Sequence, residues 1–480
     1  MVFSDLFFLF AFLPSFLLLY ILGGTTRIRN VVLILFSLIF YAWGEPVYVL
    51  LMIGSSVLNY LCGLLIAGKD DRRRKSALIL GIIINILILA TFKYLGFIVA
   101  NLTCMDIYLD VPPIALPIGI SFYTFQSISY LVDVYRNEAQ VQKHYVNLLL
   151  YISMFPQLIA GPIVRYGTIA KEIGDRRATA EDLAEGIYRF IIGLGKKVII
   201  ANQLSEISSQ FLSDSLSHLT TYGAWIGLVA FTLQIYFDFS GYSDMAIGLG
   251  RCMGFHFNEN FRHPYCCDTI TDFWRRWHIS LGSFFRDYIY IPLGGNRKHQ
   301  PINILLVWFL TGMWHGASWN FIIWGLYFGI LLMVEKWTVL KVKDWIPIPI
   351  KHIVAILLVT IGWGIFYFES FSDMLWFFDT LFCHPQITGG RLFILVYEGY
   401  DFAAVSALTD NFWLWVTAVL FCMPLRHWTG LLVQWITPSK SFLQHSLILA
   451  GRLMVSIVLL TLSVALLVGA TNNAFIYTRF

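Results

Sequence analysis

Long apolar runs separated by short polar segments follow one another along most of the 480-residue chain. Many approach the ~20 apolar residues that an α-helix needs to cross the hydrocarbon core of a bilayer. The predicted spans lie near residues 6–22, 31–43, 47–67, 77–99, 114–132, 146–163, 186–204, 222–239, 302–334, 352–368, 405–425 and 452–470. This pattern predicts an all-α polytopic membrane protein, with a transmembrane core over residues 1–336 and further transmembrane helices over residues 337–480.

The composition supports a membrane protein and argues against a soluble one. Hydrophobic residues make up 58% of the chain and charged residues 13%, whereas soluble domains carry about 25% charged residues. A soluble fold would leave much of this apolar surface in contact with water. The net charge of +4 arises from short basic clusters between apolar runs, so it gives no indication of nucleic-acid binding.

The basic loops predict the orientation of the chain in the membrane. Arg27 and Arg29 follow the first predicted span, and residues 69–75, with five Lys and Arg residues, follow the third. Because cytoplasmic loops are enriched in Lys and Arg, both loops are expected inside the cell and the N-terminus outside. The stretch 369–404 is richer in acidic residues, so we expect it to form an external loop.

One charged and aromatic segment, residues 264–300, differs from a plain span. Between residues 273 and 288 its aromatic side chains recur at three- and four-residue steps, which predicts an amphipathic helix with an aromatic stripe. Such a helix lies at the membrane interface or enters the membrane as a re-entrant element. Its side chains Trp274, Arg275 and Trp277 precede His278, which is a catalytic candidate; an ordinary interfacial histidine is the alternative.

The run 302–334 contains no Asp, Glu, Lys or Arg. As one helix it would be roughly 50 Å long, whereas the hydrocarbon core is about 30 Å thick, so it must be strongly tilted or broken. Gly312 and Gly316 flank His315 and favour a break at this position. A break would place the imidazole near the middle of the membrane.

A polar side chain at that depth is costly unless it faces a cavity or a partner. Trp314, Ser318 and Asn320 lie close to His315 in the sequence, and together they favour a functional site over a structural histidine bonded to a neighbouring helix. A neutral histidine in a dry cavity suits general-base activation of a hydroxyl. With His278 from a second segment, it would orient a substrate carbonyl and transfer a proton.

A further polar group comprises Gln234, Asp238 and Tyr242, which share one helical face. The buried carboxylate of Asp238 needs a partner, and we expect an arginine of the 275–286 segment. This arrangement favours an architectural role. Arg165, Lys196 and Lys197 are candidates for binding an anionic ligand, although basic side chains that reach the membrane surface are commoner.

The sequence contains no metal-ligand spacing, no P-loop and no GxSxG motif. Acyl transfer from a thioester needs only a base, an electrophile held in line and polarising donors. Several ordered motifs resemble those of the membrane-bound O-acyltransferases, and within that family the membrane subunits of bacterial alginate O-acetylation. These motifs are residues 117–125, 155–166, 238–246, 260–265, 272–290 and 313–317.

The resemblance implies a ring of tilted helices, with re-entrant or interfacial helices, around a central tunnel. It places His315 at the family's near-invariant histidine and His278 at its second polar position. The implied donor is cytoplasmic acetyl-CoA, with no permanently bound cofactor, and Arg297 and Lys298 at the inner mouth would hold its phosphates. The acetyl group would then reach an extracytoplasmic polysaccharide through a separate Ser-hydrolase-like acetyltransferase of the SGNH type.

Three alternatives remain open from the sequence. A D-alanyl transferase of teichoic acid modification belongs to the same family. A proton-coupled transporter or flippase would use Asp238, Gln234 and His315 as a proton relay, although the chain lacks a matching pair of broken helices in two halves. A non-catalytic scaffold for the envelope partner would not need His315.

Overall fold

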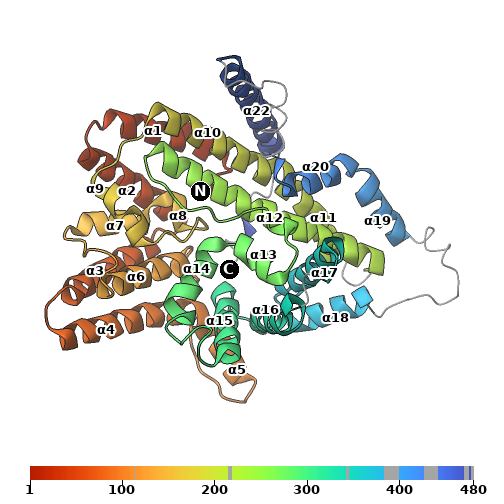
Figure 1. Cartoon of the computed structure of the whole chain (residues 1–480), viewed down its shortest axis with the longest axis horizontal. Coiled ribbons are helices and arrows are strands. Elements are labelled where there is room, and N and C mark those ends of the chain that lie inside the picture. Colours follow the sequence, from red (N-terminus) through yellow and green to blue (C-terminus); the bar gives the residue numbers. More distant parts are fainter. Residues whose placement is uncertain are drawn as a thin grey trace.

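The computed structural model describes residues 1–112, 114–213, 219–341, 345–382, 399–425, 442–469 and 475–476. Within these ranges every regular element is a helix, which confirms the all-α prediction. The short helices α13 (Ile270–Arg276) and α14 (Ile279–Phe285) lie near the centre of the molecule, with longer helices arranged around them (Figure 1).

The first half of the chain forms helices that largely follow the apolar runs. They are η1 (Phe8–Phe12), α1 (Leu13–Leu22), α2 (Thr26–Ala42), α3 (Tyr48–Ile66), α4 (Asp71–Leu89), η2 (Ala90–Tyr94), α5 (Leu95–Thr103), α6 (Ile120–Tyr135), α7 (Tyr145–Ser153), α8 (Phe155–Leu158), α9 (Tyr166–Gly174), α10 (Ala180–Gly195), η3 (Lys196–Ala201), α11 (Asn202–Leu212) and α12 (Thr221–Cys252). The single span predicted over 146–163 is wrong, because α7 ends at Ser153 and the short separate helix α8 begins at Phe155, with Pro156 in its first turn. The span predicted over 222–239 is too short, since α12 continues to Cys252.

The second half contains shorter and more broken elements. They are η5 (Pro264–Cys266), α13, α14, η6 (Arg286–Tyr290), α15 (Gln300–His315), α16 (Trp319–Trp337), η7 (Val339–Lys341), α17 (Ile348–Tyr367), α18 (Phe371–Phe382), α19 (Gly399–Thr409), α20 (Phe412–Cys422) and α22 (Phe442–Gly469). Of the external loop predicted over 369–404, α18 occupies residues 371–382, and residues 383–398 lie outside the described part of the chain.

Polar side chains cap several helices where they begin. Asp70 accepts a hydrogen bond from the Arg72 amide at the start of α4, and Thr179 and Asp182 form a reciprocal capping box at the start of α10. These bonds satisfy amides that have no partner inside the helix. The hydrogen bonds from Thr179 also hold the pKa of the Asp182 carboxyl below its ordinary value.

Five described helices are long and apolar enough to cross a membrane. They cover residues 48–66, 71–103, 319–341, 348–367 and 446–469, and α19 with α20 forms a sixth candidate bent by 62°. Many large apolar side chains on these helices are exposed, such as Leu50 and Val468, as expected where lipid is the solvent. The chain is therefore a multi-pass membrane protein, although fewer helices meet this test than the twelve runs predicted.

The run 302–334 is broken as predicted, because α15 ends at His315 and α16 starts at Trp319. The two helices then pack against each other in opposite directions. Backbone atoms of Gly312 and Gly325 approach closely, and Gly329 contacts Trp308. The run is thus a helical hairpin with His315 at its tip, and not one long element interrupted midway.

Candidate active site

His315 is the last residue of α15, and only 3% of its surface is exposed. Its imidazole packs against three aromatic rings, with centroid distances of 4.9 Å to Trp314, 4.9 Å to Trp324 and 5.2 Å to Phe366. These rings come from α15, α16 and α17, so the imidazole is enclosed by protein and not by lipid. Such an enclosure excludes bulk water and strengthens electrostatic interactions inside it.

His278 lies between α13 and α14 and is 2% exposed. It adopts a left-handed backbone conformation with φ 44°, so the single amphipathic helix predicted over residues 273–288 is wrong. Asn260 stabilises the break, since its backbone carbonyl accepts from the Ile279 amide at 3.0 Å and its side-chain carbonyl accepts from the Ser280 amide at 3.1 Å.

The Asn260 side chain also orients the second histidine. Its Oδ1 lies 3.1 Å from Nδ1 of His278 and accepts from the Ser280 hydroxyl at 2.8 Å. The Ser280 hydroxyl in turn accepts from the Ile163 amide at 3.0 Å. Because an amide oxygen can only accept, the imidazole donates from Nδ1 to Asn260, and this fixes the tautomer of the neutral His278 ring.

One indole contacts both histidines. The Trp314 ring lies 5.9 Å from the His278 ring and 4.9 Å from the His315 ring. It is also stacked on Phe125 at 5.6 Å and 23°. Two segments that are separate in the sequence thus bring their imidazoles to the same aromatic residue, and their roles in the reaction stay predictions.

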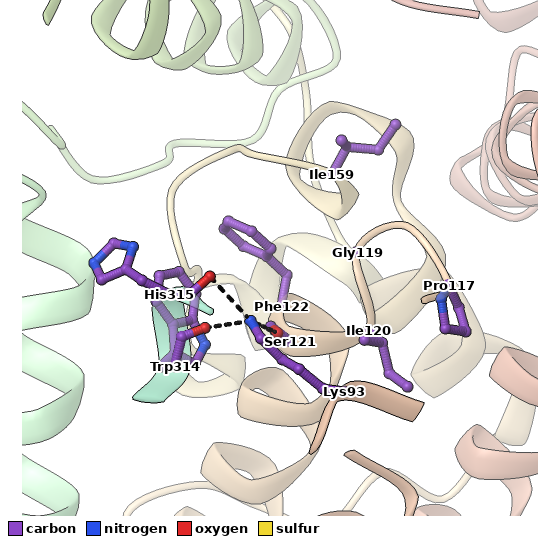
Figure 2. A pocket seen from close by; sticks show the side chains of 9 residues that line it. All are labelled: Lys93, Pro117, Gly119, Ile120, Ser121, Phe122, Ile159, Trp314 and His315. Atoms are coloured by element: carbon purple, nitrogen blue, oxygen red, sulfur yellow. Dashed lines mark hydrogen bonds between the residues drawn. The ribbon is translucent and has the colours of Figure 1, made fainter. Parts of the chain in front are cut away.

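A small, partly open recess adjoins this cluster. It is lined by Lys93, Pro117, Gly119, Ile120, Ser121, Phe122, Ile159, Trp314 and His315 (Figure 2). The backbone carbonyls of Trp314 and His315 face Lys93, whereas the His315 imidazole points away from it (Figure 2). At the hairpin tip the recess is therefore bordered by backbone carbonyls, and the His315 imidazole extends from the opposite side of the tip, away from the recess (Figure 2).

Lys93 was not among the residues predicted from the sequence, and only 8% of its surface is exposed. Its ammonium donates to the carbonyl of Trp314, to the carbonyl of His315 at 3.3 Å and to the hydroxyl of Ser121 at 3.3 Å. A signal was present, because Lys93 is the single charged residue in the predicted span 77–99. Charged residues inside spans are rare and usually functional.

The predicted supporting residues take different positions. Trp274 and Trp277 belong to an aromatic cluster, and their ring centroids lie 6.5 and 4.7 Å from that of Trp363. Arg275, by contrast, is exposed on α13. The Asn320 amide donates to the Phe368 carbonyl at 2.6 Å and so joins α16 to the end of α17.

Ser318 is the residue before α16, and its hydroxyl oxygen is buried without a hydrogen-bond partner among the described residues.

Asp238 does not pair with an arginine of the 275–286 segment, so that prediction is wrong. The ammonium of Lys197 lies 2.5 Å from its Oδ1, and the amide of Ile476 donates to Oδ2 at 2.9 Å. The reason is that η3 packs along α12 and places Lys197 against this carboxylate. Gln234 accepts from the Ser208 hydroxyl at 2.7 Å, as expected for an architectural group between α11 and α12.

The remaining basic candidates already have partners or lie far from the histidines. Lys196 pairs with Asp244 at 2.7 Å, and Arg165 pairs with Asp287 at 2.7 Å. Burial raises the pKa of the Asp287 carboxyl, but hydrogen bonds from Arg286 and Arg165 outweigh it and leave the pKa below its ordinary value.

Arg297 and Lys298 are exposed in the loop before α15. This loop is held by Asn303, whose amide donates to the carbonyls of Gly295 at 3.1 Å and Lys298 at 2.7 Å. Because α15 rises about 1.5 Å per residue, Gln300 and His315 are roughly 22 Å apart. The described residues contain no group of three metal-binding side chains.

Comparison with known proteins identifies the family. The model of the membrane-bound O-acyltransferase family matches residues 135–372. The chain is 44% identical to the probable alginate O-acetylase AlgI of Pseudomonas aeruginosa over 392 residues, which cover 80% of this chain and 75% of that protein. It is 38% identical to the peptidoglycan O-acetyltransferase of Helicobacter pylori, over 70% of each chain.

A third relative is named for the transfer of a different acyl group, D-alanyl. The chain is 30% identical to the teichoic acid D-alanyltransferase of Bacillus subtilis, over 53% of this chain and 68% of that protein. The all-helical membrane architecture and these similarities agree, and the chain belongs to the membrane-bound O-acyltransferase family and is an O-acyltransferase.

Proposed function

We propose that this chain transfers acetyl groups from cytoplasmic acetyl-CoA, across the cell membrane, for O-acetylation of an extracytoplasmic polysaccharide. The observation that carries this proposal is the imidazole of His315 at the tip of a helical hairpin, enclosed by aromatic rings and joined to His278 through Trp314. The relatives with the higher identities, 44% and 38%, are named as O-acetylating proteins.

In the proposed reaction His315 acts as the general base. It takes the proton from an acceptor hydroxyl as the oxygen attacks the thioester carbonyl carbon. The new C–O bond forms, the C–S bond breaks, and the CoA thiolate receives the proton from the imidazolium. His278, oriented by Asn260, assists by polarising the carbonyl or holding the hydroxyl in line.

The donor is expected to enter from the side of the basic loops. Residues 69–75 lie at the start of α4, and residues 291–299 precede α15; Lys93, in the π-helical turn η2 that follows α4, meets His315 at the end of α15. We expect both helices to start on one face of the membrane, and the excess of Lys and Arg in these segments indicates that this face is the cytoplasmic one. Arg297 and Lys298 would hold the CoA phosphates there, and the thin pantetheine arm would follow a tunnel to the histidines.

The outer face of the membrane holds the N-terminus and the final acyl transfer in this scheme. The N-terminus is external on this orientation. A separate Ser-hydrolase-like acetyltransferase would complete the transfer to the sugar hydroxyl, because residues with that triad arrangement are not recognisable in this sequence.

The test is acyl transfer by purified protein in lipid nanodiscs. We expect the wild-type protein to consume radiolabelled acetyl-CoA when an acceptor glycan and the envelope acetyltransferase are present, and not to use a D-alanyl carrier protein. His315→Ala should lower the rate about 10²–10⁴-fold, the usual contribution of a general base, without loss of expression. Wild-type activity in purified His315→Ala would refute the role of His315, and D-alanyl transfer would favour the alternative supported by the teichoic acid relative.

A further inference from the structure

We propose that Lys93, together with Tyr94, is a positioning residue that caps the end of α15 and so holds the imidazole of His315 in place. This inference deepens the proposed function, since it rests on His315 as the base. It names two side chains from the span 71–103 that control the hairpin tip.

The carbonyls at the end of a helix lack partners within the helix, and here each has one. The Gly312 carbonyl accepts from the Gly316 amide at 3.4 Å, at the limit of a normal bond. The Met313 carbonyl accepts from the Tyr94 hydroxyl at 2.7 Å. The next two carbonyls, of Trp314 and His315, accept from the Lys93 ammonium. Two adjacent side chains of a neighbouring span therefore bond three successive carbonyls.

The charge of Lys93 suits this place. A helix C-terminus carries partial negative charge that a cation stabilises, and the described residues include no ion pair with Lys93 within 4.0 Å. An ammonium has three donors, and the Trp314 carbonyl, the His315 carbonyl and the Ser121 hydroxyl use all three. Lys93 therefore has no donor left for a phosphate or an oxyanion, which argues for positioning and against substrate binding.

The local backbone explains how two neighbouring residues reach one helix end. Lys93 and Tyr94 lie in the π-helical turn η2, which interrupts the α-helical span 71–103. Such wider turns redirect side chains and are frequent at functional sites. Farther along the same span, Asn101 accepts from the indole nitrogen of Trp319 at 2.9 Å. One span thus holds the hairpin on both sides of its turn.

The variants that test this inference are Lys93→Met, Lys93→Gln and Tyr94→Phe. Two controls match them. Lys75→Met removes an exposed positive charge, and Tyr327→Phe removes another tyrosine bond to a helix carbonyl, that of Leu358 at 2.8 Å. Each protein is compared in nanodiscs for the kcat and KM of acetyl transfer and for hydrogen–deuterium exchange of the peptide 309–320.

We expect Lys93→Met to lower kcat about 100-fold, as a displacement of about 1 Å would, with KM for acetyl-CoA changed less than threefold. Amides 316–318 should exchange at least tenfold faster. Tyr94→Phe should show the same pattern to a smaller degree, and both controls should match the wild type. Lys93→Gln keeps two hydrogen-bond donors and should therefore recover part of the lost kcat. If Lys93→Met does not accumulate in the membrane, kcat and exchange in Lys93→Gln test the positioning role instead.

Two results would overturn the inference: an unchanged kcat in both Lys93 variants, or a loss confined to KM, which would make Lys93 a substrate-binding group. The exchange measurement separates this inference from the proposed function. If His315→Ala is active but exchange at residues 316–318 still rises in the Lys93 variants, His315 is not the general base, whereas Lys93 still caps the end of α15.

Discussion

Replacing Gly312 by alanine tests whether close packing of the hairpin sets the position of His315. A Cβ at this position would lie 2.3 Å from the carbonyl oxygen of Phe321 and 3.1 Å from its carbonyl carbon. Ordinary contacts are 3.4–4 Å, and both atoms belong to the backbone of α16, which cannot rotate away. The two helices would therefore have to separate by about 1 Å where they cross, at a cost of about 1–3 kcal/mol.

The displacement should reach the chemistry, because His315 lies three residues farther along α15. A misplacement of about 1 Å at a catalytic group lowers the rate by up to ~10²-fold. The assays are thermal unfolding of the detergent-solubilised protein and the rate of acetyl transfer in nanodiscs.

Gly54→Ala in α3 is the matched control, since no atom lies within 4 Å of its added Cβ. Both variants gain about 1 kcal/mol of helix propensity, so the difference between them isolates the clash. We expect Gly312→Ala to unfold at a lower temperature and to be at least tenfold slower than Gly54→Ala. Equal unfolding temperatures and rates within twofold of each other would refute the argument that this contact positions His315.

Two further perturbations probe buried polar groups. Asn260→Ala removes the acceptor of His278 and of Ser280, which should destabilise the protein by roughly 1–3 kcal/mol for each group left unpaired and slow acetyl transfer. If His278 assists the reaction, His278→Ala should add little to the rate loss of Asn260→Ala; fully additive losses would disprove their coupling. Lys197→Met leaves the Asp238 carboxylate without its ammonium and should cost about 3–5 kcal/mol; adding Asp238→Asn should restore part of the unfolding temperature, and no recovery would argue against the pair.

The sequence predicted features that depend on neighbouring residues. A run of 302–334 without charges is longer than the membrane is thick, and it carries glycines beside a histidine. These local facts were enough to predict the break at His315, which is confirmed by α15 and α16. They did not predict that the chain reverses there, because the reversal depends on the approach of Gly312 to the Phe321 backbone.

Features that depend on distant partners were missed or wrong. The break at His278 depends on Asn260, which lies 18 residues earlier. The partner of Asp238 is 41 residues away in Lys197. Lys93 reaches the carbonyl of Trp314 across 221 residues. The three- and four-residue spacing of aromatic residues continues unchanged across the break at His278, because the hydrogen bonds that stabilise the break come from Asn260. The spacing alone therefore could not show where the helix ends.

The hairpin constrains which reactants can meet at His315. From the basic loops, α15 covers roughly 22 Å to His315, and the span from Ala77 covers roughly 24 Å to Lys93. For helices that run close to the membrane normal from the inner edge of the hydrocarbon core, this depth would exceed half of its thickness of about 30 Å. A donor from the cytoplasm must then cross most of the membrane on a long, thin, uncharged arm, whereas an acceptor from outside has less than 10 Å to travel. A hydroxyl on a small group or a protein side chain can reach that depth, while the bulky, hydrated body of a polysaccharide stays outside, which favours relay through a separate acetyltransferase over direct entry of the glycan.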